Sequence, residues 1–345
     1  MYKRQVQEVE GYRTDVRVCN LSLLNTDWYI DQMKRKYYDS EALPISLNTE
    51  HYIQGKNDVL YYVNREGTDR PLYLDRYIGA VRNDSKQIRH AIGGDRHQQY
   101  INTFPSKTFV LDVNQEQAQK IVPNRLKPLV QDKIEWKVNK SYLEKKDLVM
   151  LDMIANINKN GWKRPIYFST TLGPSNYLNL KDHMLLEGLA YRLLPAKHGD
   201  RNGDINTEKM YENMMTKFKW RQMDNPSVFY DENYKRFVFN ARFQYYILSA
   251  QLLNEGKREK AKEVVNYCLT ILPDNTFPYD EYSTQFIPLL FELKEDKKAF
   301  DMSILMGDRA IEMLDYMMKT NQLSSDAIRR LSLIHISEPT RLGMI

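Results

Sequence analysis

The stretch from Glu8 to Lys36 constrains the fold of this chain most, because it predicts a strand, a turn and a helix in succession. The strand is the β-rich run VRVCNLSLL at 16–24, which follows the turn-forming Gly11. Residues 25–27, Asn-Thr-Asp, carry side-chain oxygens that cap helix starts, and an amphipathic helix with a basic end follows. A strand that leads through a capped turn into a helix is the opening of an α/β unit.

The turn after this strand is the best-placed candidate site. Open α/β sheets usually place ligands at the carboxyl ends of their strands. Here Asp27 is followed by two aromatic residues, and aromatic faces with carboxylates suit a sugar or a peptide. In the alternative interpretation, Asp27 only helps to cap the helix and Trp28 packs in the core. No catalytic residue is predicted. The predicted substrate-binding residues, from this turn and a later Ser-Thr turn, are Asn25, Asp27, Trp28, Tyr29, Ser169 and Thr170.

A second α/β block follows from about residue 109. Its expected elements are a strand at 109–113, a short helix at 115–121, a strand at 134–138, a long helix at 143–160 ended by Gly161, a strand in RPIYFSTTLG at 164–173 and a strand in EGLAYRLLP at 187–195. Strands and helices in this order and spacing favour parallel pairing through a crossover.

The segment between these two blocks is punctuated by Gly and Pro, and loops and small strands over a core are expected there. RHAIGGDRHQQYINTFPSK at 89–107 is interpreted as an exposed loop. Five tyrosines form a sugar-stacking platform in one interpretation and pack with their hydroxyls outward in the other: Tyr52, Tyr61, Tyr62, Tyr73 and Tyr77.

From Thr207 onward the hydrophobic period becomes helical. Helices are expected at 207–219, 231–255, 258–272, 281–294 and 298–320. FQYYILSAQLLNEGKREKAKEVVNYCLTILPDN at 243–275 resembles a tetratricopeptide repeat, with small residues at Ser249, Ala261 and Cys268 where the two helices approach. One such repeat cannot bury its own face, so a short helical cap is expected and not a long solenoid.

Charge and composition exclude some classes of protein. The net charge of +5 comes from Lys and Arg interleaved with acids, as in KREKAKE, so no nucleic-acid partner is expected. No run approaches the ~18 to 20 apolar residues of a membrane span, and no signal peptide opens the chain. Cys19 and Cys268 make no disulfide framework and are interpreted as small buried residues.

No metal or cofactor is predicted. Asp200, Asn202 and Asp204 have the spacing of an EF-hand loop, but Ile205 and Tyr211 stand where that loop needs glycine and glutamate. The histidines do not pair at zinc spacing, and no glycine-rich phosphate fingerprint follows a strand. The 200–204 segment is therefore interpreted as an ordinary polar loop.

EVEGYRTDVRVCNLSLLNTDWYIDQMKRKYYDSEALPISL at 8–47 closely resembles the segment just after the membrane-embedded part of a bacterial family of large membrane proteins. That family is related to protein O-mannosyltransferases and was long catalogued as a domain of unknown function. The resemblance continues through RPIYFSTT and EGLAYRLLP and covers about 6–320. The acidic Asn-Gly-Asp-Asn-Asp run and the Pro-Leu-Trp-Tyr segment that precede Gln7–Gly11 in that family are absent here.

Together, the pattern and the resemblance predict an α/β domain at 6–204, with a small mixed or parallel sheet, followed by an all-α domain at 205–322 with tetratricopeptide-like hairpins. The ends at 1–5 and 331–345 resemble joining sequence and are interpreted as non-native. The resemblance implies the extracytoplasmic part of a glycosyltransferase-like protein of the bacterial inner membrane, which moves mannose or a related sugar from a lipid-phosphate donor onto a protein.

In that reading the catalytic acid belongs to the membrane-embedded remainder of the parent chain, which would also be the partner of this region. The region alone is expected to catalyse nothing and to help bind a saccharide or peptide acceptor. The main alternative is a helical-repeat module that binds a peptide or a partner helix. A weaker alternative, suggested by the tyrosine content, is a stand-alone periplasmic sugar-binding protein.

Overall fold

The computed structural model describes residues 2–64, 67, 69–93, 99–199, 204–320 and 324, with side chains from Val6 onward. The chain divides into two compact units. One comprises Met1–Phe168, Leu172–Met184 and Arg192–Asp204, and the other comprises Ser169–Thr171, Leu185–Tyr191 and Ile205–Ile345. No helix in the described residues combines the length and the apolar character that a membrane crossing requires.

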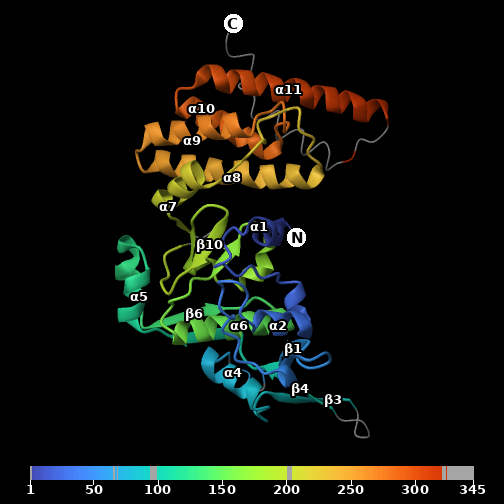
Figure 1. Cartoon of the computed structure of the whole chain (residues 1–345), viewed down its shortest axis with the longest axis vertical. Helices are drawn as coiled ribbons and strands as arrows, with labels where there is room; N and C mark the ends of the chain where they lie inside the picture. The colour runs from blue at the N-terminus through green and yellow to red at the C-terminus, as the bar shows by residue number, and fades with distance from the viewer. Residues whose placement is uncertain are drawn as a thin grey trace. The chain divides into compact units, whose positions relative to one another are not determined.

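The elements up to the end of the sheets are the following, and Figure 1 labels several of them. The helices are α1 (Tyr2–Glu10), the 3-10 turn η1 (Leu23–Asn25), α2 (Asp27–Met33), α3 (Thr49–Tyr52), α4 (Leu74–Arg82), α5 (Gln115–Ile121), η2 (Asn124–Leu129), α6 (Lys145–Lys159), η3 (Pro174–Tyr177) and η4 (Lys181–His183). The strands are β1 (Val59–Tyr62), β2 (Leu72–Tyr73), β3 (Arg89–Ile92), β4 (Gln99–Phe104), β5 (Thr108–Asp112), β6 (Lys133–Lys137), β7 (Tyr142–Glu144), β8 (Tyr167–Ser169), β9 (Met184–Leu186), β10 (Ala190–Leu193) and β11 (Asp204–Ile205).

The strands form small mixed sheets, which confirms the predicted fold class. One sheet has the order β3-β4-β1-β7, another β2-β5-β6 and a third β11-β9-β10-β8. β1 pairs in parallel with β4 and antiparallel with β7, and β2 pairs in parallel with β5. The predicted parallel crossover between the strands at 109–113 and 134–138 is wrong, because β5 and β6 pair antiparallel from Thr108↔Lys137 to Asp112↔Lys133. The seven-residue α5 rises only about 10 Å, too little to run back along a five-residue strand of about 17 Å.

The predicted first strand at 16–24 is also wrong. Residues 16–20 have no regular structure, and η1 begins at Leu23. Val16 and Val18 are 40% and 37% exposed, while Arg17 between them turns inward and donates to the Gln32 carbonyl at 2.6 Å. With its valines outward, this run has no apolar face to bury against a sheet. The helix predicted after it is confirmed as α2, although α2 ends at Met33, before the basic residues.

The segment between 37 and 107 is more ordered than the sequence indicated. The predicted exposed loop at 89–107 is wrong, since β3 and β4 form an antiparallel pair there and Asn102–Phe104 is buried. The helix α4 was not predicted. Tyr52 and Tyr77 are 0% and 1% exposed, so the five tyrosines form no sugar-stacking platform, and their hydroxyls do not all point outward.

The helix α6 is the centre of the first unit's core. Of the residues expected on its apolar side, Leu148, Leu151, Ile154 and Ile157 are all 5% exposed or less, whereas Met153 is only half-buried. It packs against α4 and η1. Gly161 follows its end with a φ of 70°, the left-handed conformation that closes helices and favours glycine.

The buried Asp152 on α6 fixes the chain before α3. Its carboxylate accepts hydrogen bonds from the Ser46 N–H (2.7 Å), the Ser46 hydroxyl (2.6 Å), the Leu47 N–H (3.2 Å) and the Asn156 amide (2.8 Å). Buried carboxylates persist only when their oxygens are satisfied in this way. Segment 46–47 is therefore held to α6 by one side chain.

The second unit is helical. Its helices are α7 (Thr207–Glu212), a π-helical turn (Asn213–Lys217), α8 (Glu232–Asn254), α9 (Arg258–Ile271), η6 (Glu281–Gln285), α10 (Phe286–Glu292) and α11 (Asp296–Lys319). These positions confirm the five predicted helices. Figure 1 shows α9 between α8 and α10, with α11 next to α10. Of the ends interpreted as non-native, 1–5 and 331–345, Met1 and 331–345 lie outside the described residues, as do residues 200–203 of the predicted polar loop.

The α8–α9 hairpin closes at small side chains, as the pattern predicted. The Ser249 hydroxyl donates to the Ala261 carbonyl at 2.8 Å, and Ala261 and Cys268 are fully buried. Gly256 reverses the chain between the helices with a φ of 75°. The buried Arg242 donates to the Leu272 carbonyl at 2.8 Å and so satisfies the end of α9. The likeness to a tetratricopeptide repeat stays a prediction.

We expect Asp152→Ala to lower the free energy of unfolding by about 3 kcal/mol, because it strands the buried N–H donors of segment 46–47. Asp132→Ala, which removes an exposed carboxylate from the same unit, is the matched control and should change stability by less than about 0.5 kcal/mol. Urea unfolding followed by circular dichroism measures both variants. Equal stability of the two would show that the Asp152 contacts do not support the fold.

Acidification should destabilise the fold through His183. Burial lowers the pKa of this imidazole from 6.5 to about 4. Between these values the unfolded chain binds a proton that the folded chain does not, so stability falls as pH falls, by up to about 1.4 kcal/mol per pH unit. His183→Asn can still donate to the Ala196 carbonyl, as His183 Nδ1 does at 3.1 Å, and should remove this slope. Parallel unfolding curves of both proteins from pH 7 to pH 4.5, with no change in their difference, would contradict the assignment.

Candidate functional site

The four predicted site residues at 25–29 separate into structural and exposed ones. Asn25 Oδ1 accepts the backbone N–H of Lys146 at 2.9 Å, so this side chain satisfies the start of α6 and not that of α2. Tyr29 is 4% exposed, and its hydroxyl accepts the Asn20 N–H at 2.8 Å. Both residues therefore position the turn and are not available to a ligand.

Asp27 and Trp28 remain accessible. Trp28 is 56% exposed, so the alternative in which it packs in the core is wrong. Its ring meets the fixed Tyr29 ring edge-on at 5.6 Å between centroids. Asp27 Oδ1 accepts the N–H of Trp28 at 2.7 Å. The predicted pair of an acid and an exposed aromatic thus exists with Trp28 alone, on the first turn of α2.

Asp31 extends this pair along α2 and joins it to α3. Asp31 Oδ1 accepts the Tyr52 hydroxyl at 2.6 Å and lies 3.4 Å from the Thr49 hydroxyl. Burial, and then the hydrogen bond to Asp31, raises the pKa of Tyr52 to about 12, so the phenol stays protonated. We call the surface formed by Asp27, Trp28 and Asp31, with Thr49 at its edge, the α2 face.

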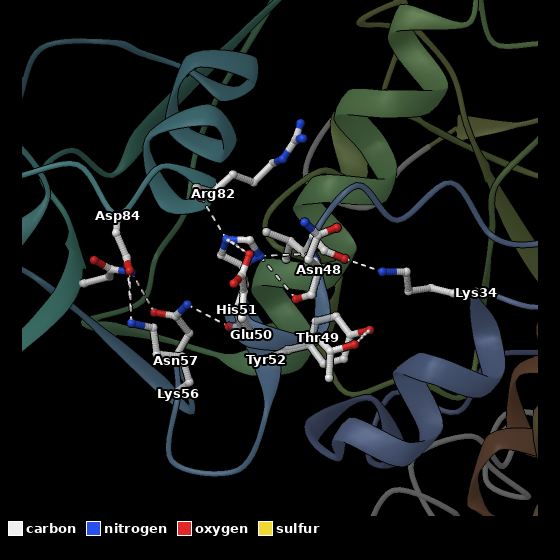
Figure 2. A network of polar contacts seen from close by, with 12 residues as sticks. Lys34, Asn48, Thr49, Glu50, His51, Tyr52, Lys56, Asn57, Arg82 and Asp84 are labelled. Carbon is white, nitrogen blue, oxygen red and sulfur yellow. Dashed lines mark hydrogen bonds and ion pairs between the residues drawn. The ribbon is translucent and has the colours of Figure 1, made fainter.

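A network around His51 holds α3 in place (Figure 2). His51 Nδ1 accepts the Asn48 N–H at 3.0 Å, so Nε2 carries the proton that it donates to the Arg82 carbonyl at 2.8 Å, at the end of α4. The Asn57 amide donates to the His51 carbonyl at 2.8 Å. A four-residue helix has little stability of its own, so these contacts fix its position.

The network continues to Asp84, as Figure 2 shows. Its carboxylate lies 3.3 Å from Lys56 Nζ and 3.0 Å from Arg89 Nη2. Burial alone would raise the pKa of Asp84, but these cations and the Asn102 amide outweigh it and lower the pKa. Asn102 also donates to Asn57 Oδ1 at 3.0 Å. The support beneath α3 is thus charged and hydrogen-bonded throughout.

Ser169 and Thr170, the other predicted site residues, belong to the second unit. Ser169 Oγ lies 2.8 Å from the Thr171 hydroxyl. Thr170 Oγ1 donates to the Leu189 carbonyl at 3.3 Å and accepts the Asn240 amide at 3.1 Å. These partners all come from their own unit, whereas the α2 face consists of residues of the first unit. The hydroxyls hold the turn after β8.

Sequence reasoning missed Asp31 and Thr49 as members of the α2 face. Asp31 lies three and four residues after Trp28 and Asp27, a spacing that places all three on one side of a helix and could have identified it. Thr49 comes from a helix too short to show any period. Among the described residues, no group of three or more His, Cys, Asp or Glu side chains is arranged to hold a metal ion.

Comparison of the sequence with known protein families identifies the family of this chain. The model of the family described as TMEM260-associated domain 2 matches residues 5–209, more than half of the chain. The chain belongs to this family. No curated protein and no solved structure matches it. The match includes the whole α2 face and its support, and it links this region to TMEM260, a predicted protein O-mannosyltransferase. The coarse part of the predicted resemblance, association with a glycosyltransferase-like membrane protein, is thereby supported.

A double-mutant cycle tests the contact that joins α2 to α3. Because the Tyr52 hydroxyl is buried against Asp31, we expect a coupling free energy of about 1.5 kcal/mol between Asp31→Ala and Tyr52→Phe. The pair Asp31→Ala and Thr49→Ala is the control and should couple by less than about 0.5 kcal/mol, since its contact is long and exposed. Additive effects of the first pair, measured by chemical unfolding, would contradict the bond.

Proposed function

We propose that this chain is the accessory, acceptor-binding region of a glycosyltransferase-like membrane protein of the protein O-mannosyltransferase type. The family match over 5–209 carries the proposal. In such a protein, mannose or a related sugar passes from a lipid-phosphate donor to a protein acceptor, and the catalytic acid belongs to the membrane-embedded part. This region packs on that part and helps to bind the acceptor.

The α2 face supports acceptor binding. Trp28 offers an exposed aromatic surface beside two carboxylates, and α3 beneath it is fixed by the His51 network. Binding constellations need such a rigid support, because side chains held in one geometry lose less entropy when a ligand arrives. We place the parent protein in a bacterial inner membrane and this region on its extracytoplasmic side, on the strength of the sequence resemblance.

The second unit supports an alternative function, a tetratricopeptide-like module that binds a peptide. Tyr282 is 48% exposed and its ring lies 6.1 Å from that of Phe243 on α8. Grooves lined by aromatic side chains bind proline-rich peptide segments. The two functions differ in where a ligand binds: substitutions at Tyr282 would reduce binding in the module, and substitutions at Trp28 would reduce it in the acceptor-binding region.

The purified chain should transfer no sugar by itself. Incubated with polyprenyl-phosphate mannose, labelled in the sugar, and a Ser/Thr-rich acceptor protein, it should give no label above a reaction without protein. Transfer should appear when membranes that contain the membrane-embedded part are added. A heat-unfolded sample of the chain is the control for stimulation. Turnover by the chain alone would refute the proposal.

The genomic locus gives an independent test. Several hydrophobic spans and an acidic Asn-Gly-Asp-Asn-Asp run encoded directly upstream of codon 6 would support the proposal. A start codon with no such spans would overturn it and leave the peptide-binding module as the leading function.

A further inference from the structure

Trp28 is unlike the other tryptophans of the chain. All four lie in the described residues, and Trp136, Trp162 and Trp220 are 5%, 4% and 8% exposed, against 56% for Trp28. The edge-on contact with Tyr29, itself fixed by Asn20, holds the Trp28 ring from one side. An exposed, oriented indole is an available face for a cation or an apolar group.

The two carboxylates on the same helix as this ring, Asp27 and Asp31, differ from other acids of the chain in their charge partners. Asp27 and Asp31 are four residues apart on α2, a spacing that makes them neighbours of like charge and destabilises a helix. Neither forms an ion pair with a basic side chain in the part of the chain that the structure describes. By contrast, Glu116 at the same spacing on α5 pairs with Lys120 at 2.7 Å. Lys34, the first basic residue after α2, donates instead to the Leu47 carbonyl.

We propose that the α2 face binds a basic segment of the acceptor polypeptide, with a Lys or Arg side chain over the Trp28 ring and its cation beside Asp27 and Asp31. This specifies the acceptor class and rests on the proposed function. A cation satisfies both features at once, because it is attracted by the indole face and relieves the repulsion between the carboxylates. A neutral saccharide could stack on the indole but would not relieve the repulsion between the two carboxylates.

Collisional quenching of tryptophan fluorescence tests the charge on this face. Since Trp28 alone is exposed, added quenchers report mainly on it. Relative to free N-acetyltryptophanamide, caesium should quench more strongly than iodide, and this difference should fall at least twofold in Asp27→Asn/Asp31→Asn. Neutral acrylamide should quench the wild type and this variant equally. Stronger quenching by iodide than by caesium, each relative to N-acetyltryptophanamide, would overturn the proposal.

Binding is measured with three probes: an Arg-Thr octapeptide, a Glu-Thr octapeptide of the same length and methyl α-mannoside. The basic peptide should shield Trp28 from acrylamide, and its affinity should fall with added salt. Asp27→Asn/Asp31→Asn should weaken this binding at least fivefold, and Trp28→Ala should weaken it similarly. Asparagine at 31 can still accept the Tyr52 hydroxyl, so the variant keeps its fold, as circular dichroism would verify. Asp132→Asn, an exposed carboxylate elsewhere, is the matched control and should bind as the wild type.

Equal binding of both peptides, no binding of the basic one, or mannoside binding that the Asn variant does not affect would each overturn the proposal. These measurements do not depend on sugar transfer, so the two proposals can fail separately. Basic-peptide binding at Trp28 in a chain whose locus encodes no membrane part would sink the proposed function alone. Stimulated transfer without basic-peptide binding would sink the basic-acceptor proposal alone.

Discussion

The buried carboxylate of Asp152 is the contact on which the candidate site depends. It holds the backbone of segment 46–47 to α6, and that segment leads directly into Asn48 and α3. From α3, Tyr52 reaches across to Asp31 and fixes the side of α2 that carries Trp28. Burial raises the pKa of Asp152, and four donors offset part of this penalty. The buried Asp152 thereby helps to position the α2 face, although it contacts none of the residues that form it.

Helices with strong periodicity could be predicted from the sequence, and elements defined by distant partners could not. The bounds of α5, α6, α8 and α9 followed from period, caps and glycine stops, which are local properties. The run at 16–24 has a high strand propensity, yet a strand forms only where a neighbour accepts its hydrogen bonds and an apolar face is buried. β3 and β4 stabilise each other in a segment that reads as loop, and α3 depends on His51 and Asn57.

The candidate site was predicted in part. Residues 25–29 were predicted as a site because they follow a predicted strand. The structure has no strand before this turn, so that reason does not hold. The turn is nevertheless where an exposed aromatic residue meets carboxylates. Which of its side chains face solvent depends on the packing of α2 against η1 and α3, which no local pattern reveals: Tyr29 is buried and Trp28, its neighbour in sequence, is exposed. Asp31 could have been found from the helical spacing alone.

The charges on the α2 face indicate which kind of ligand it would bind. The chain carries a net charge of +5, and several exposed acids elsewhere in the first unit form ion pairs, as Asp15 does with Arg13 and Glu41 with Lys36. A surface ion pair contributes little stability, so its absence at Asp27 and Asp31 would by itself mean little. The spacing of Asp27 and Asp31 makes it more important, because two like charges one turn apart destabilise the helix that carries them. The exposed apolar ring of Trp28 beside them is also unfavourable in water. A cationic side chain over the ring would reduce both the carboxylate repulsion and the exposure of the indole, which favours a basic acceptor over a neutral one.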